Sequence, residues 1–206
     1  MQFLNIFFIT VQKTIFMEIN QAARKVVIVG DQNVGKTSII QRLIEHKFNS
    51  NIQPTIGTYT HTYSTTTSSG RQVTMKIWDT AGAEQYQALT GVYFRDSQAV
   101  IIIFDATKSS CVERVTEWIK KYKEVADDGF IAVAGNKSDL INDLSEAKTQ
   151  CLDIESEIGL PVTLVSALNG DNITQLFKYV ADNICENNMA TKLPLELNQD
   201  QSKCSC

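Results

Sequence analysis

The sequence lacks the features of a membrane-spanning, secreted or nucleic-acid-binding protein. No stretch of its 206 residues approaches the run of about eighteen apolar residues that a spanning helix needs. Asp and Glu (23) outnumber Lys and Arg (19), so the net charge of −4 gives no reason to expect nucleic acid as a partner. The five cysteines include no C-x-x-C pair, which is typical of cytosolic proteins, and Cys111, Cys151 and Cys185 are most simply packing residues. We expect one compact domain of ordinary size.

Residues 1–16 also lack the early positive charge and long apolar core of a secretory signal, since Lys13 is their only charge. Six apolar residues at helical spacing would allow a short membrane-surface helix: Phe3, Leu4, Phe7, Phe8, Val11 and Ile15. The simpler interpretation is that translation begins at Met17. We therefore treat residues 1–23 as an N-terminal extension of the domain.

The chain is organised around a glycine loop at residues 30–38, which reads G-D-Q-N-V-G-K-T-S and matches the phosphate-binding pattern G-x-x-x-x-G-K-[ST]. Backbone N–H groups of such a loop surround phosphate oxygens, while Lys36 adds positive charge and Thr37 offers a hydroxyl to Mg²⁺. An apolar run precedes the loop and apolar residues at helical spacing follow it, which is the setting in which this motif binds phosphate. The residues expected to contact nucleotide here are Asp31, Gln32, Asn33, Val34, Gly35, Lys36, Thr37 and Ser38.

A second motif, D-T-A-G at residues 79–82, directly follows a β-hairpin. The hairpin is predicted from alternating residues in 58–67 and 73–78, with a turn at 68–70. A carboxylate at a strand end opposite the phosphate loop suits an outer-shell partner of Mg²⁺, which gives Asp79 its expected role. Gly82 is placed to give its N–H to a γ-phosphate oxygen at close approach.

A third motif, N-K-S-D at residues 136–139, closes another predicted strand. The carboxylate of Asp139 can accept hydrogen bonds from N1 and N2 of guanine, whereas adenine presents no such pair of donors, so an adenine-nucleotide enzyme is the disfavoured alternative. The stem of Lys137 can lie along the base, with Phe48 covering the opposite edge. A backbone N–H of residues 166–168 would reach the guanine carbonyl. The residues expected around the base are Phe48, Asn136, Lys137, Asp139, Ser166, Ala167 and Leu168.

Beyond residue 91, predicted strands alternate with predicted helices. Apolar runs mark strands at 100–104, 131–134 and 162–165, and helical spacing marks helices within 112–125, 144–158 and 173–184. This alternation predicts a three-layer α/β fold, in which a six-stranded, mostly parallel sheet has one antiparallel edge strand and helices on both faces. The domain should span residues 24–186, and the polar residues 187–206 should form a flexible tail.

Over about residues 24–186 the chain resembles the small GTPases of the Ras superfamily, and within them the Rab family. The pieces that carry the Rab resemblance are W-D-T-A-G at 78–82, Y-F-R-D-S at 93–97, I-F-D-A-T at 103–107 and the ending K-C-S-C at 203–206. The resemblance implies a P-loop G domain that binds GTP or GDP with Mg²⁺. The implied metal ligands are Thr37 and Thr55, with Asp79 through water, and the implied catalytic positions are Lys36, Thr55, Gly82 and Ala83.

The same resemblance implies a monomeric switch in membrane trafficking. Residues 48–57 and 79–95 would be its two switch segments, ordered by the γ-phosphate and released on hydrolysis. Effectors, an exchange factor and a GTPase activator would bind through 48–60 and 79–95. Cys204 and Cys206 would carry two geranylgeranyl groups, with a prenylation escort and a GDP-dissociation inhibitor as partners. The protein would sit on the cytosolic face of an endomembrane (endosome, Golgi or vesicle) and shuttle with the cytosol.

Two positions depart from the family pattern. Thr60 stands where Rab proteins carry an aromatic residue of the effector surface, although Trp78 and the pair Tyr93-Phe94 remain. Ala83 stands where the family has the glutamine that orients the attacking water. Since alanine cannot hydrogen-bond a water, intrinsic GTP hydrolysis should be slow. The alternative is a GTP-loaded adaptor with negligible hydrolysis.

Overall fold

The structure, a computed structural model, describes residues 23–190 apart from 83–89, 109–110, 127 and 142–143. The predictions for residues 1–22, for Ala83 and for Cys204 and Cys206 therefore lie outside the described residues. The strands are β1 (Arg24–Val29), β2 (Thr58–Thr66), β3 (Gln72–Thr80), β4 (Ala99–Asp105), β5 (Phe130–Asn136) and β6 (Val162–Leu164). The helices are α2 (Lys36–Glu45), α3 (Thr90–Phe94), α4 (Cys111–Lys123), α5 (Leu144–Ile158) and α6 (Ile173–Ala190), with a 3₁₀ turn η2 (Ser138–Leu140).

The six strands form one sheet in the order β2-β3-β1-β4-β5-β6. Only β2 and β3 pair antiparallel, and the other neighbours pair parallel. The predicted fold class is therefore confirmed. The last helix continues to Ala190, into the region where the sequence predicted the start of the tail.

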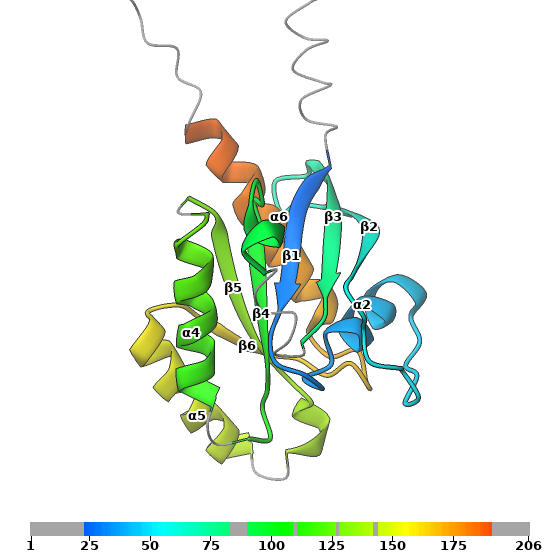
Figure 1. Cartoon of the computed structure of the whole chain (residues 1–206), viewed down its shortest axis with the longest axis vertical. Coiled ribbons are helices and arrows are strands. Elements are labelled where there is room, and N and C mark those ends of the chain that lie inside the picture. The colour runs from blue at the N-terminus through cyan, green and yellow to red at the C-terminus, as the bar shows by residue number, and fades with distance from the viewer. Residues whose placement is uncertain (1–22, 83–89, 109–110, 127, 142–143, 191–206) are drawn as a thin grey trace, which may run out of the picture.

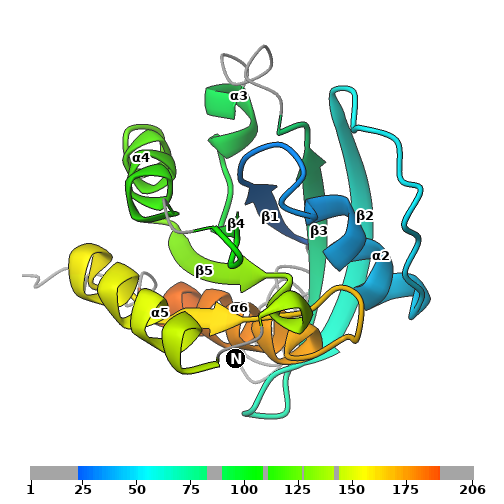
Figure 2. The same ribbon diagram turned by 90° about the horizontal axis from the view of Figure 1, so that it is seen from below.

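Helices cover both faces of the sheet, and each face has its own hydrophobic core (Figures 1 and 2). On β1, Val26 and Ile28 face the core formed with α2 and α6, whereas Val27 and Val29 face the core formed with α3, α4 and α5. All four side chains are fully buried, which explains why this strand reads as a continuous apolar run. Within the described residues, no helix is both long enough and apolar enough to cross a membrane.

The parallel strands bring their carboxyl ends to one edge of the sheet. The glycine loop follows β1, the D-T-A-G motif begins within the end of β3, and the N-K-S-D motif begins at the end of β5. The segment 165–172 follows β6 at the same edge and leads into α6. Ligands of open α/β sheets bind at this edge, and so the topology gathers the three sequence motifs there.

Candidate nucleotide-binding site

The glycine loop ends at Gly35 in a backbone conformation that favours glycine. Gly35 has φ of +93°, and a Cβ built on it would lie 2.3 Å from Nδ2 of Asn136. Helix α2 begins at the next residue, so the free N–H groups of its first turn open toward the loop. A backbone of this kind suits an anion that approaches the start of α2.

Lys36 lies inside the loop and is only 6% exposed. Its Nζ donates to the carbonyl oxygens of Gly30 at 2.8 Å and Asp31 at 2.9 Å. Burial lowers the pKa of Lys36 from 10.5 to about 8, although the nearby carboxylates of Asp79 and Asp31 act in the opposite direction. A bound phosphate would compensate this burial, because an anion beside the amine favours the charged form.

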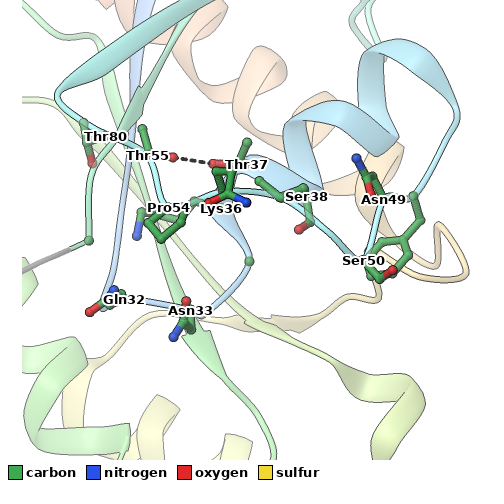
Figure 3. Close-up of a pocket in the computed structure, with 15 residues that line it drawn as sticks. Gln32, Asn33, Lys36, Thr37, Ser38, Asn49, Ser50, Pro54, Thr55 and Thr80 are labelled. Carbon is green, nitrogen blue, oxygen red and sulfur yellow. Dashed lines mark hydrogen bonds between the residues drawn. The ribbon is translucent and has the colours of Figure 1, made fainter.

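Thr37, Thr55 and Asp79 converge from three separate segments, as the prediction of a Mg²⁺ site requires. The hydroxyl of Thr37 donates to Oδ2 of Asp79 over 2.7 Å and lies 2.9 Å from the hydroxyl of Thr55 (Figure 3). Asp79 is fully buried, and its Oδ1 has no hydrogen-bond partner among the described residues. Burial raises the pKa of Asp79, against the opposing effect of the Thr37 hydrogen bond and of Lys36.

This arrangement fits Mg²⁺ by the chemistry of its donors. Two hydroxyls and a buried carboxylate oxygen without a partner are oxygen ligands of the kind that Mg²⁺ prefers, directly or through water. No group of three or more His, Cys, Asp or Glu side chains gathers into a metal site in the part of the chain that the structure describes. A Mg²⁺ ion here would thus depend on the hydroxyls, on water and on phosphate oxygens of a nucleotide, as is usual for this ion.

Gly82 packs directly against the glycine loop. A Cβ built on it would lie 2.4 Å from Nζ of Lys36 and 2.5 Å from the carbonyl oxygen of Asp31. Just before it, the N–H of Ala81 donates to the carbonyl oxygen of Gly57 at 3.0 Å, which joins the end of β3 to the stretch that carries Thr55. Glycine is therefore needed at position 82, because a side chain there would meet both Lys36 and the backbone of the glycine loop.

These residues enclose a cavity of about 240 Å³ (Figure 3). Its wall comes from the glycine loop with the start of α2, from the segment that runs from Phe48 to Thr55, and from Thr80 and Gly82. Gln32, Asn33 and Ser38, which the sequence predicts to contact nucleotide, also line this cavity. Phe48 lies at the wall with 39% of its surface exposed.

Asp31 and Val34, which are also predicted to contact nucleotide, have side chains that contact other parts of the protein. Their backbone groups are therefore the part that a nucleotide could contact. The carboxylate of Asp31 accepts hydrogen bonds from Nε of Arg114, at 3.0 Å to its Oδ2, and from Nε1 of Trp118 at 3.2 Å, both on α4. The hydrogen bond from Arg114 lowers the pKa of Asp31 more than burial raises it. Val34 is 4% exposed and packs in the core with α2 and α6.

The residues predicted around the guanine base form a second cluster, which Asn136 connects to the glycine loop. Nδ2 of Asn136 donates to the carbonyl oxygen of Val34 at 2.8 Å, and its Oδ1 accepts from the N–H of Ala167 at 3.1 Å. Asn136 is only 2% exposed. These are buried bonds between three segments, so the phosphate side and the base side of the predicted pocket are held in a fixed relation.

Within this cluster, the carboxylate of Asp139 is oriented by Ser166. The hydroxyl of the fully buried Ser166 donates to Oδ1 of Asp139. Lys137 adopts the left-handed conformation with φ of +70°, and its Nζ pairs with Oδ2 of Asp105 at 2.6 Å. Burial alone would raise the pKa of Asp105, but hydrogen bonds from Lys137 and Thr107 lower it. Sequence reasoning missed Asp105, which anchors the ammonium and so directs the stem of Lys137.

The predicted partner surface is only partly as expected. Trp78 and Tyr93 lie together, with ring centroids 6.1 Å apart, and Nζ of Lys25 lies 4.4 Å from the ring centroid of Trp78. Thr60 is the partner of Trp78 in the pairing of β2 with β3. The expectation that Phe94 belongs to this surface is wrong, because Phe94 is fully buried and packs edge-on against Tyr122.

A phosphate-type glycine loop at the carboxyl edge of a parallel sheet covered on both faces defines the class, a P-loop nucleotide-binding protein. The profile of the Ras family matches residues 25–186. GTP-binding protein ypt5 of Schizosaccharomyces pombe is 33% identical over 182 residues, which cover 87% of this chain and 82% of the relative. Rab-31 of Rattus norvegicus is 37% identical over 163 residues, with 78% and 82% covered.

Ras-related protein SEC4 of Saccharomyces cerevisiae is 32% identical over 170 residues, which cover 82% of this chain and 78% of the relative. The chain therefore belongs to the Ras family and is a small GTPase related to the Rab proteins. Its general activity is the binding of GTP and its hydrolysis to GDP and phosphate.

Proposed function

We propose that this chain is a Rab-like switch of membrane trafficking that binds GTP and GDP with Mg²⁺. The observation that supports this proposal is the convergence of Thr37, Thr55 and Asp79, because it joins the segment 48–57 to the phosphate loop where we propose that Mg²⁺ binds. A segment held in this way responds to the presence of the γ-phosphate and is released when that phosphate leaves.

Different residues of the chain bind the phosphates, select the base and affect hydrolysis. Lys36 holds the β- and γ-phosphates, and the N–H of Gly82 reaches the γ-phosphate. Asp139 and the backbone of residues 166–168 select guanine. Mg²⁺, when bound, neutralises charge on the phosphate oxygens. Ala83 provides no side chain to hold a water in line with the γ-phosphate, so intrinsic hydrolysis is slow.

The membrane role follows from the two switch segments and the tail. The surfaces 48–60 and 79–95 recruit effectors in the GTP state and also take the exchange factor and the GTPase activator. Cys204 and Cys206 carry the lipid anchors. The monomer then cycles between the cytosolic face of an endomembrane and the cytosol, escorted in its GDP state by a dissociation inhibitor.

The localisation of a tagged copy in its own cell tests this proposal. A copy with a fluorescent tag at its N-terminus should label an endomembrane, and Thr37→Asn should move it to the cytosol because the variant loses the hydroxyl that faces Mg²⁺. Thr62→Asn, on an exposed position of β2, is the matched control and should leave the pattern unchanged. A native copy without endomembrane label, or an unchanged pattern in Thr37→Asn, would contradict the proposal.

Ala83 also supports a second candidate, a GTP-loaded adaptor that recruits partners with negligible turnover. Single-turnover release of γ-phosphate, with and without a Rab-type GTPase activator, separates the two. A switch shows hydrolysis that the activator accelerates, whereas an adaptor stays loaded with GTP in both conditions.

A further inference from the structure

Arg42 of α2 lies outside every sequence motif, yet its guanidinium contacts the loop that follows β6. Nε donates to the carbonyl oxygen of Ala167 at 2.8 Å, and Nη2 donates to that of Leu168. Nη1 donates to the carbonyl oxygen of His46, the residue that caps α2, at 2.9 Å. One side chain thus connects the end of α2 to the loop that carries the predicted contacts to guanine.

The contacts of Arg42 with the carbonyls of Ala167 and Leu168 fix the orientation of the two peptide planes that follow these residues. In a planar trans peptide, the C=O and the following N–H point in opposite directions. Because the carbonyl of Ala167 points to Arg42, the N–H of Leu168 points away from it. Because the carbonyl of Leu168 also points to Arg42, the N–H of Asn169 points away as well, and it donates to the hydroxyl of Ser166 at 3.1 Å.

A continuous chain of hydrogen bonds therefore runs from Arg42 to the predicted base-selecting carboxylate. It passes through the peptide between Leu168 and Asn169 to the hydroxyl of Ser166, which donates to Oδ1 of Asp139. Such chains polarise one another and hold their members in one geometry.

The loop's own hydrogen bonds, as far as the structure describes them, hold its ends and Asn169 but not the peptide between Ala167 and Leu168. Its backbone closes at the ends, where the N–H of Ser166 donates to the carbonyl of Asp171 at 3.1 Å and the N–H of Gly170 donates to the carbonyl of Ser166 at 2.8 Å. Between these bonds, Leu168 is 46% exposed. The planar fork of an arginine holds two adjacent carbonyls with separate N–H groups in a fixed geometry, whereas the ammonium of a lysine donates from a single nitrogen on a flexible stem.

We propose that Arg42 is a positioning residue for guanine recognition. It holds the N–H of Leu168 toward the 6-oxo group of the base, and through Ser166 it holds the carboxylate of Asp139 toward N1 and N2. Because the N–H of Ala167 donates to Oδ1 of Asn136, the N–H of Leu168 is the donor of residues 166–168 that we assign to the base. This inference rests on the proposed guanine pocket and adds the residue that shapes it.

The test compares two nucleotides on the full chain, with Mg²⁺, by fluorescent competition. GDP carries the 6-oxo group and the N1 donor, whereas the diphosphate of 2-aminopurine riboside lacks both and keeps the N2 amino group. In Arg42→Met, GDP binding should weaken about tenfold, the effect of one lost hydrogen bond to a polar group. Binding of the 2-aminopurine nucleotide should weaken by less than about threefold, because that base makes no bond to the N–H of Leu168 and keeps only the N2 contact to Asp139.

Arg42→Lys should lose an intermediate part of GDP affinity, and it serves as the second variant if Arg42→Met does not fold. Arg71→Met is the matched control, since Arg71 lies in the turn between β2 and β3 beside Cys185 of α6. It should leave both nucleotides unchanged. Equal weakening of both nucleotides by Arg42→Met would show a merely structural role, and unchanged GDP binding would equally overturn the inference. A native chain that does not prefer GDP to ADP would instead overturn the guanine pocket itself.

Discussion

The hydroxyl of Thr37 and the carboxylate of Asp79 form a hydrogen bond of 2.7 Å that joins the phosphate loop to the end of β3. The other oxygen of Asp79 is buried and has no partner among the described residues. A buried carboxylate oxygen without a hydrogen bond is costly. Mg²⁺ with its waters would remove this cost, which is why the pair indicates a metal-dependent nucleotide site.

The first prediction concerns this carboxylate. Asp79→Asn should weaken Mg²⁺ binding, because it removes the negative charge from the metal side of the pocket. Release of GDP should then be fast in the presence of Mg²⁺, whereas the native chain should release GDP fast only after EDTA is added. Stopped-flow release of a fluorescent GDP measures both rates. Asp182→Asn is the control, since Asp182 bonds only to the turn at Ser68 among the described residues. Equal Mg²⁺ dependence in Asp79→Asn and the native chain would refute the metal site.

The second prediction concerns selection of the base. Asp139→Asn should weaken GDP binding by about 1–3 kcal/mol or more and favour xanthine nucleotides, because an amide cannot accept two hydrogen bonds from N1 and N2 of guanine. Competition between GDP and XDP for the variant measures this exchange. Asp153→Asn on the exposed side of α5 should behave as the native chain. Unchanged GDP affinity in Asp139→Asn would reject the guanine pocket.

The third prediction concerns the position that lacks glutamine. Intrinsic hydrolysis in Ras-like switches is on the order of 10⁻⁴ per second, and each ~1.4 kcal/mol added to the barrier slows it tenfold. Ala83→Gln restores an amide that can hold the attacking water, so single-turnover γ-phosphate release at saturating Mg²⁺ should be faster in the variant. Nucleotide affinity should be the same in both proteins. If the two hydrolysis rates agree within about twofold, some other group in 48–57 or 83–91 positions the water.

The fourth prediction concerns the tail. Residues 187–206 hold only Lys192 and Lys203 against Glu196 and Asp200, so they offer no polybasic patch as a second anchoring signal. One lipid chain gives marginal, reversible membrane binding and two give stable anchoring. Cys204 and Cys206 should therefore both be prenylated, and Cys→Ser at either one should shift much of the protein to the soluble fraction.

Intact-mass analysis of the mature protein checks the tail directly. An unmodified or singly modified tail would reject double prenylation. A double Cys→Ser variant that still pellets with membranes would reject it as well, and would make residues 1–16 the candidate anchor.

The fold was predictable because its signals are local. Strands such as β4, buried on both faces, read as continuous apolar runs, and the amphipathic helix α4 shows its period over 13 residues. Helix α3 was not predicted, because five residues are too few to show a helical period. The sequence predicts a surface position for Phe94 on that helix, since nothing in the local pattern reveals that Tyr122 covers it.

The site was predictable only where a motif carries it. Asp139, Lys36 and Asp79 belong to short patterns whose residue types state their chemistry. Arg42 belongs to no motif, and the motif that contains Asp105 does not state its role, because each of the two acts on a segment that is distant along the chain. Arg42 bonds to a loop 125 residues away, and Asp105 pairs with Lys137 across 32 residues. These contacts arise from packing of α2 against the loop and of β4 against β5, which a single sequence does not reveal.

The most direct test of the account is the choice of nucleotide. Titration of the native chain with mant-GDP and with mant-ADP, at the same Mg²⁺ concentration, compares a base with the N1 and N2 donors to one without them. A site whose buried polar groups are built for one base rejects the other by about 10⁴-fold, so mant-GDP should bind tighter by about that factor. Equal affinities, or tighter binding of mant-ADP, would contradict the assignment of Asp139, Ser166 and Asn136 to guanine recognition and with it the proposed switch.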